Sequence, residues 1–185
     1  MPAASYADYA DILLAMPATA NDIARRLGLD DTALRATLRG MLQLGLAHPG
    51  MLRIAGRSRE AIWIMGEGQQ CPDGRRIRPA RPKAHLIGFA GLWRELEDGA
   101  TSRQACAESG ASKVTFVRLL RHLRGRQAAH ITAWERDAIG RPVAVWRIGS
   151  GRDAKKPTKP RREANRQWRQ RRRLRDAFAP MREAA

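Results

Sequence analysis

The chain repeats itself, and this repeat constrains the fold more than any other feature of its 185 residues. At an offset of 82, identical residues coincide in the pairs Thr19 and Thr101, Gly28 and Gly110, Leu38 and Leu120, and His48 and His130. At an offset of 83, the coinciding pairs are Trp63 and Trp146, Gly66 and Gly149, and Gly68 and Gly151. Matches that keep their order and need one single-residue insertion indicate an internal duplication, and therefore two copies of one fold.

Helix-start signals recur in the two units. In the first unit, Thr19 followed by Asp22 has the spacing of an N-cap residue and its N3 partner. Gly28 suits a tight turn or a C-cap, and Asp30 is the expected N-cap of the next helix. The matching residues of the second unit are Thr101, Gln104, Gly110 and Ser112. The pattern predicts two short helices joined by a tight turn in each unit.

An apolar face at helical spacing follows each turn, and a predicted hairpin follows each face. The apolar residues are Leu34, Leu38, Met41 and Leu42 in the first unit, and Phe116, Leu119, Leu120 and Leu123 in the second. The expected hairpin strands are residues 51–55 and 61–65, then 130–135 and 143–148. A further helix is expected upstream of each unit, over 6–15 and 85–97. Helix, helix, turn, helix and hairpin together predict a helix-turn-helix with a β-wing.

Two stretches resemble a known family. Residues 19–46, which begin TANDIARRLGL, resemble the winged helix-turn-helix of MarR-type regulators, and residues 112–123 (SKVTFVRLLRHL) resemble their recognition helix. The run from His130 to Lys155 also resembles small winged-helix proteins of phages and prophages. The resemblance implies double-stranded DNA binding and transcription regulation, in a protein of bacterial or phage origin.

The expected fold is α+β and mainly helical, with two tandem winged-helix domains and a basic C-terminal tail helix. The first domain takes residues 1–70 and the second takes residues 85–150. A basic, proline-rich linker over 71–84 joins the domains, and an arginine-rich tail takes 151–185.

Charge is distributed unevenly along the chain, whose formal net charge is +17. Residues 1–70 contain seven arginines and seven acidic residues, and therefore contribute nothing to this excess. Residues 71–150 contain fifteen basic and seven acidic residues, and residues 151–185 contain thirteen basic and four acidic ones. Such a balance predicts a polyanionic partner for the second unit and the tail.

The helix after the tight turn is expected to enter the major groove. Its outward residues in the second unit are Ser112, Lys113, Thr115, Arg118, Arg121 and His122. Lysine and arginine side chains can reach guanine acceptors there, and hydroxyls can contact bases or phosphates. An ordinary solvated helix face is the competing interpretation, and the basic context favours groove contact.

The first unit departs from this pattern. Its helix starts with Asp30 and Asp31, which stabilise a helix N-terminus but repel phosphates. We therefore expect it to bind DNA weakly, through Arg35 and Arg39, or to serve as a contact for a second copy or another protein. Hairpin-turn arginines are further candidate DNA contacts, namely Arg57 and Arg59 in the first unit and Arg141 in the second.

The linker and the tail each allow two interpretations. The linker has five basic residues and three prolines, so it either follows the DNA backbone or is a plain spacer. The tail begins with a stiff basic segment, 155–160, and a helix is expected over 161–178. Its Trp168, Leu174 and Phe178 could form an apolar stripe, while Arg171, Arg172 and Arg173 are candidate phosphate contacts. Disorder in the free protein is the alternative, because charges this dense repel one another.

We expect no enzyme activity, no cofactor and no metal, because no phosphate-binding loop, ligand cluster or catalytic set is evident. His48 and His130 are expected to be structural. Trp63, Trp134 and Trp146 are expected to pack across strands rather than to stack on bases. Cys71 and Cys106 form no disulfide framework, and neither a signal peptide nor a membrane span is evident. A cytoplasmic, nucleoid-associated location follows.

Four functions fit the sequence. A sequence-preferring regulator is favoured by the base-reading residues. An architectural, DNA-condensing role and RNA binding are favoured by the charge of the tail. A replication or recombination accessory role would use the neutral first unit to recruit partners.

Overall fold

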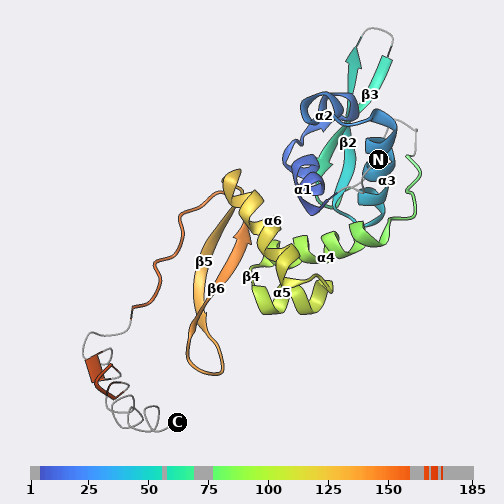
Figure 1. Cartoon of the computed structure of the whole chain (residues 1–185). Helices are drawn as coiled ribbons and strands as arrows, with labels where there is room; N and C mark the ends of the chain where they lie inside the picture. The colour runs from blue at the N-terminus through green and yellow to red at the C-terminus, as the bar shows by residue number, and fades with distance from the viewer. Residues whose placement is uncertain are drawn as a thin grey trace.

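The computed structural model describes residues 5–55, 58–68, 77–158, 165–166, 168–170 and 172. It confirms the predicted α+β class and shows more residues in helices than in strands (Figure 1). The first half comprises α1 (Tyr6–Leu14), β1 (Ala18–Thr19), α2 (Ala20–Leu27), α3 (Asp31–Gln43), β2 (Ala47–Ala55) and β3 (Ser58–Met65). The second half comprises α4 (Ala84–Asp98), β4 (Ala100–Thr101), α5 (Ser102–Ser109), α6 (Lys113–Gly125), β5 (Ala129–Arg136) and β6 (Pro142–Ile148). The same order of elements therefore occurs twice.

Each half has one antiparallel three-stranded sheet, with strand orders β1-β3-β2 and β4-β6-β5. The register of β2 shifts between Pro49 and Met51, and that of β5 shifts between Ile131 and Ala133. These positions correspond at the offset of 82, so the irregularity is duplicated with the fold. The short strands β1 and β4 were not predicted, because two residues are too few to show an alternating pattern.

The helix caps are those that the sequence predicts. The Thr19 side chain accepts a hydrogen bond from the Asp22 amide at 3.2 Å. Thr101 forms a complete capping box with Gln104. Gly28 and Gly110 both have left-handed backbones, with φ of 65° and 66°, where a side chain would be strained. These caps fix the turn that leads into α3 and α6.

The hydrophobic core runs through both halves without interruption. α1 of the first half packs against α6 of the second, and α4 of the second half packs against α3 of the first. Between α1 and α4, the Phe89 ring lies 5.7 Å from that of Tyr6 and 5.4 Å from that of Tyr9. The halves are thus joined reciprocally, as two subunits of a symmetric dimer are.

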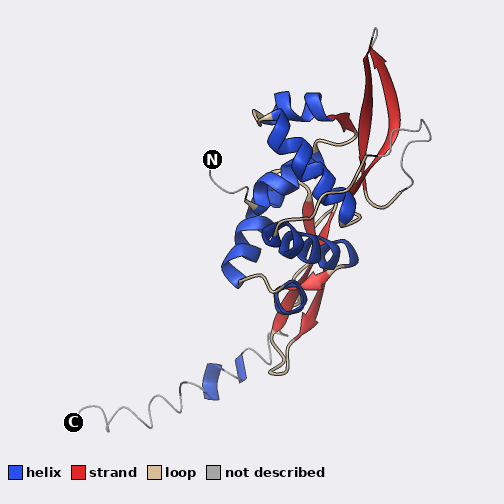
Figure 2. Cartoon of the chain, turned by 90° about the vertical axis from the view of Figure 1, so that its right-hand side faces the viewer, coloured by secondary structure: helices blue, strands red, loops and turns tan. Residues whose placement is uncertain are grey.

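The hairpins and the helices occupy different parts of the molecule. Both hairpins project beyond the helices, at opposite ends of the view in Figure 2. The strands extend further than predicted, since β2 starts at Ala47 and β3 at Ser58. No helix in the described ranges is long and apolar enough to cross a bilayer.

Candidate nucleic-acid interface

The face of α6 that points to solvent is fixed by the face that is buried. Phe116, Leu119, Leu120 and Leu123 lie in the core, as predicted. Ser112 caps the helix by accepting a hydrogen bond from the Thr115 amide at 3.1 Å, and its hydroxyl lies 2.9 Å from that of Thr115. The helix therefore presents a defined set of side chains outward.

Three cations stand on that outward face. Lys113, Arg118 and Arg121 are exposed, and none has an ion-pair partner within the described part of the chain. Thr115 is half-buried, and Val114 and Val117 lie exposed among the cations. An exposed helix face with positive charge and without carboxylates is suited to a polyanion.

His122 does not belong to this face, so the expectation that it points outward is wrong. Its Nε2 lies 2.9 Å from Oδ1 of Asp11 in α1. Arg126, just after α6, donates to the other oxygen of the same carboxylate at 3.3 Å. The reason is that α6 packs on α1 at this end, and Asp11 joins the two halves there.

The equivalent face of α3 carries no comparable charge. Arg35 donates to Asp31 and to the Asn21 side-chain oxygen, each at 2.7 Å, and is thereby held by its own half. Arg39 is exposed. At the offset of 82, Lys113 of α6 corresponds to Asp31, and Arg118 corresponds to Ala36. The duplicated scaffold therefore presents three cations without ion-pair partners in the described ranges on α6, whereas α3 presents Arg39, at the position of Arg121, and an Arg35 that is already paired with Asp31.

Asp22 engages two further arginines of the first half. It accepts hydrogen bonds from Arg25 at 2.7 Å and from Arg53 at 2.8 Å. The hydrogen bond from Thr19, followed by these arginines, holds the pKa of its carboxyl below the ordinary value. The two arginines are partly neutralised by Asp22, which leaves less positive potential for an external anion.

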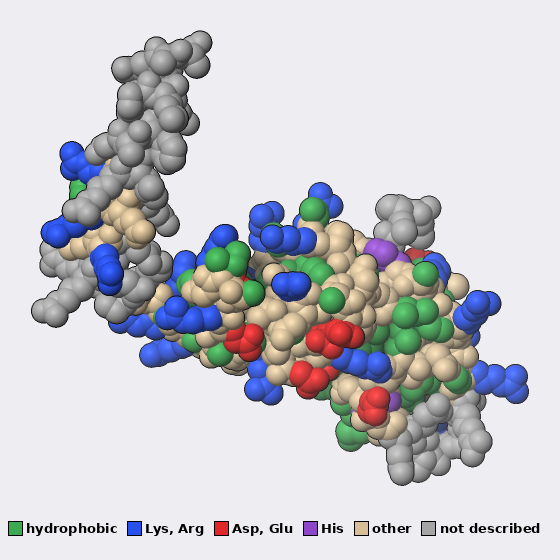
Figure 3. Space-filling model, turned by 90° about the horizontal axis from the view of Figure 1, so that it is seen from below, with side chains coloured by type: hydrophobic (Ala, Val, Ile, Leu, Met, Phe, Trp, Pro, Cys, Tyr) green, Lys and Arg blue, Asp and Glu red, His purple; other side chains and the backbone are tan. Residues whose placement is uncertain are grey.

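The candidate arginines of the hairpins have different surroundings. Arg141 is exposed in the β5–β6 turn, and its guanidinium has no ion-pair partner among the described residues. Arg59 is exposed on β3. Arg57 lies outside the described residues. Seen from below, Lys and Arg side chains are scattered along the length of the molecule, whereas Asp and Glu gather near its middle (Figure 3).

Residues 151–156, which the sequence assigned to a tail and its linker, are docked on β5. Asp153 accepts a hydrogen bond from the Ile131 amide at 2.8 Å and one from Arg124 at 2.9 Å. The Ala154 amide donates to the Ile131 carbonyl at 2.7 Å. The Trp134 indole donates to the Ala154 carbonyl at 2.9 Å. The segment therefore covers the free edge of the second sheet and fixes where the tail begins.

The described end of the linker, residues 77–83, is also packed against the first half. This packing matches neither a plain spacer nor a segment that is free to follow the DNA backbone. Ile77 packs against the core, and the Ala80 amide donates to the Arg39 carbonyl of α3 at 3.3 Å. A Cβ on Gly40 would lie 3.6 Å from the Pro82 backbone and within 2.8 Å of Leu86. Gly40 thus permits the linker and α4 to approach α3 closely. Residues 71–76 lie outside the described ranges.

The tryptophans of the hairpins pack as predicted. Trp63 is buried in the core. Trp146 is partly buried and packs against the core, and the Arg124 guanidinium lies 5.4 Å from the Trp146 ring. Trp134 is half-buried beneath the docked segment, with Lys156 at 5.5 Å. Core packing therefore accounts for Trp63 and Trp146, and the docked segment accounts for Trp134.

Only part of the tail is described, and Arg171, Arg173, Leu174 and Phe178 lie outside that part. Residues 165–166, 168–170 and 172 are helical. Trp168 is 60% exposed and has the Arg172 guanidinium 5.4 Å from its ring. The tail tryptophan is therefore not packed into the core of the chain.

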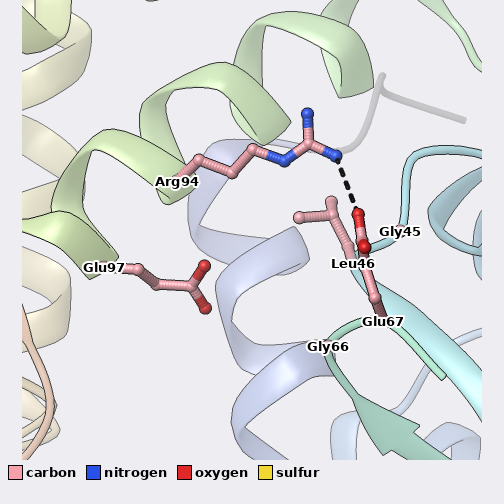
Figure 4. A pocket seen from close by; sticks show the side chains of 6 residues that line it. All are labelled: Gly45, Leu46, Gly66, Glu67, Arg94 and Glu97. Carbon is pink, nitrogen blue, oxygen red and sulfur yellow. Dashed lines mark ion pairs between the residues drawn. The ribbon is translucent and has the colours of Figure 1, made fainter.

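A small cavity lies between the first half and α4. Gly45, Leu46, Gly66, Glu67, Arg94 and Glu97 line it (Figure 4). Arg94 points toward Glu67 at 4.0 Å and donates to the Leu44 carbonyl, so its charge is already engaged. The Glu97 carboxylate is engaged as well, since it accepts a hydrogen bond from the Trp93 indole at 2.8 Å, and we interpret the cavity as a part of the contact between the halves.

Further features bear on chemistry. Within the described ranges, no three His, Cys, Asp or Glu side chains are grouped to hold a metal ion. Cys106 is a free, half-buried thiol, and burial raises its pKa. Cys71 is not among the described residues.

No protein-family model matches the chain, and no curated protein matches it significantly. Function is therefore inferred from the geometry and charge of the chain itself.

Proposed function

We propose that the chain binds double-stranded DNA through two winged-helix units, with α6 of the second unit in the major groove. One observation carries the proposal. α6 presents Lys113, Arg118 and Arg121 without ion-pair partners in the described part of the chain, while the core packing fixes their direction. Arginine and lysine in the first turns of such a helix reach guanine acceptors and phosphates.

The biological role that fits this geometry best is sequence-preferring regulation of transcription, in a bacterial or phage setting and at the nucleoid. Base readout requires side chains on a rigid scaffold, and α6 provides one. The dense charge of residues 151–185 instead supports an architectural role, since thirteen basic residues would bind any duplex. Selection from a random duplex library separates the two: a short enriched motif supports the regulator, and length dependence without a motif supports the architectural protein.

The site is tested by substitutions made in the full-length chain. The halves share one hydrophobic core, so expressing either half alone would expose part of that core. We expect Lys113→Ala, Arg118→Ala and Arg121→Ala together to weaken duplex binding at least tenfold. Arg118→Ala alone should flatten sequence preference by roughly 1–3 kcal/mol, the usual value of a base-reading arginine. Fluorescence anisotropy at one salt concentration measures both effects.

The matched control is Arg35→Ala with Arg39→Ala on α3. Because Arg35 is already held by Asp31 and Asn21, this pair should weaken binding less than threefold. A larger loss from the α3 pair than from the α6 triple would show that the first half binds DNA, and the proposal for α6 would be wrong.

A further inference from the structure

The turn between β5 and β6 is a rigid, preorganised tip. Oδ1 of Asp137 accepts hydrogen bonds from the amides of Ile139 at 3.0 Å and Arg141 at 2.7 Å. The Asp137 backbone exchanges further bonds with Gly140 at 2.8 Å and Arg141 at 3.0 Å. Gly140 has a left-handed backbone, with φ of 75°. With so many bonds in five residues, the tip holds one conformation without a partner.

This tip displays a large apolar side chain. Ile139 is 74% exposed, more than any other large apolar side chain in the described ranges. Ile139 contributes only its backbone amide to the hydrogen bonds of the turn. A polar or small residue at this position could form the same hydrogen bond, so the turn itself does not require an isoleucine. An isoleucine held outward at the end of a projecting hairpin is therefore available to a partner.

The charges beside Ile139 indicate what kind of partner fits. Arg136 and Arg141 stand on either side of the turn, and Arg136 donates to the Gly140 carbonyl at 3.3 Å. The one carboxylate within the turn, Asp137, accepts two amide hydrogen bonds, which reduces its repulsion of an external anion. An apolar tip between two cations complements a groove whose rims are phosphates and whose floor is stacked bases.

We propose that Ile139 is a wedge that enters the minor groove of duplex DNA beside the α6 site and partly unstacks one base step. The proposal rests on the DNA binding proposed above and adds to it a deformation of the DNA. Proteins that insert isoleucine, leucine or phenylalanine in this way kink the duplex by roughly 20–90° toward the major groove. Such a kink would turn the DNA around the second half, and pyrimidine–purine steps would be preferred at the wedge, because they unstack most easily.

The test measures the bend separately from the affinity. The whole chain is bound to a short duplex, chosen by library selection and labelled at its two ends, and the end-to-end distance is followed by energy transfer. We expect the unaltered chain to shorten this distance. Ile139→Ala at saturating protein should remove most of the shortening while weakening binding about two- to tenfold. Ile139→Leu, which keeps an apolar wedge, should retain it.

The controls distinguish the possible failures. Ile87→Ala removes a side chain that is 51% exposed on α4, away from the hairpin, and should leave the bend unchanged. If Ile139→Ala bends the DNA as the unaltered chain does, the wedge proposal is wrong and DNA binding still stands. If no duplex is bound at all, the proposed function itself fails. If Ile139→Ala changes only self-association, measured by sedimentation, the tip is a protein contact and the wedge proposal is again overturned.

Discussion

At the scale of single residues, one contact recurs in both halves. His48 Nδ1 lies 2.9 Å from the Gly66 carbonyl, and His130 Nδ1 lies 3.0 Å from the Gly149 carbonyl. Each imidazole ring also lies against a second glycine, Gly68 for His48 and Gly151 for His130. The ring fills the space that a Cβ on this glycine would occupy. The ring thus ties the start of one strand to the end of the next, and it requires glycine opposite.

This contact makes Gly151 sensitive to substitution. A Cβ at Gly151 would lie 2.6 Å from Cδ2 and Nε2 of His130, so the ring must turn away and break its hydrogen bond. We expect Gly151→Ala to lower the free energy of unfolding by about 1–2 kcal/mol, as overpacking combined with a broken hydrogen bond does. Urea denaturation of the whole chain measures this change.

A double-mutant cycle supplies the control for Gly151→Ala. In a His130→Ala background, the added Cβ has room and no hydrogen bond is left to break. The substitution should then cost less than about 0.5 kcal/mol. Equal costs in both backgrounds would mean that the glycine is needed for some other reason.

Residue-level prediction from the sequence was accurate for the helix caps and for the buried face of α6, which depend on neighbours along the chain. Caps such as Thr101 and the buried positions of α6 follow from local spacing, and the structure has them as predicted. Arg35 and His122 were predicted less well. Their partners Asn21 and Asp11 come from distant parts of the sequence, and helical periodicity alone does not show which outward positions another element covers.

At the scale of elements, the docked segment 151–156 covers the edge strand of the second hairpin. It occupies the otherwise open edge of β5 through Asp153 and Ala154, and an open edge would invite pairing with another chain. The sequence could not show this, because a six-residue segment held by backbone amides and one carboxylate has no periodic pattern. Residues 151–156, which the sequence assigned to the arginine-rich tail and its stiff basic start, are instead hydrogen-bonded along the edge of the sheet.

Removing the Asp153 carboxylate should release this segment. Asp153→Ala removes the bonds to the Ile131 amide and to Arg124, which together should be worth about 1–2 kcal/mol after allowance for their exposure. Cleavage by trypsin after Lys155 should therefore be about five to thirty times faster, because cleavage follows the population of the released state. Mass spectrometry of timed digests identifies the cut. Asp98→Ala, on the exposed end of α4, should leave the rate unchanged; similar acceleration by both variants would refute the anchor.

At the scale of the whole molecule, the two units behave as an internal dimer. α1 packs on α6 and α4 packs on α3, so each half contributes a helix to the other. The sequence predicted the duplication but treated the units as separate domains joined by a linker, since the repeat says nothing of which faces meet. The arrangement leaves one charged copy and one neutral copy on a nearly symmetric scaffold, in agreement with the net charges of residues 1–70 and 71–150.

The tail should contribute affinity without contributing sequence preference. Residues 159–185 contain ten basic and three acidic residues, and they follow a proline-containing segment, so no scaffold in the described part of the chain aims them at base edges. Ending the chain after Thr158 keeps the docked segment and the α6 site. This truncation should weaken binding to all duplexes alike. The slope of log K against log salt should become shallower by about 0.9 for each phosphate that the tail neutralises.

Titration of a selected duplex and a scrambled duplex at several salt concentrations measures both quantities. The ratio of the two affinities should be unchanged by the truncation and reduced by Arg118→Ala. Because counterion release is indifferent to sequence, a tail that only neutralises phosphates changes both affinities by the same factor. If the truncation instead abolishes the preference while Arg118→Ala leaves it intact, the tail reads the sequence. The helical halves would then be its support, and α6 would no longer be the recognition element.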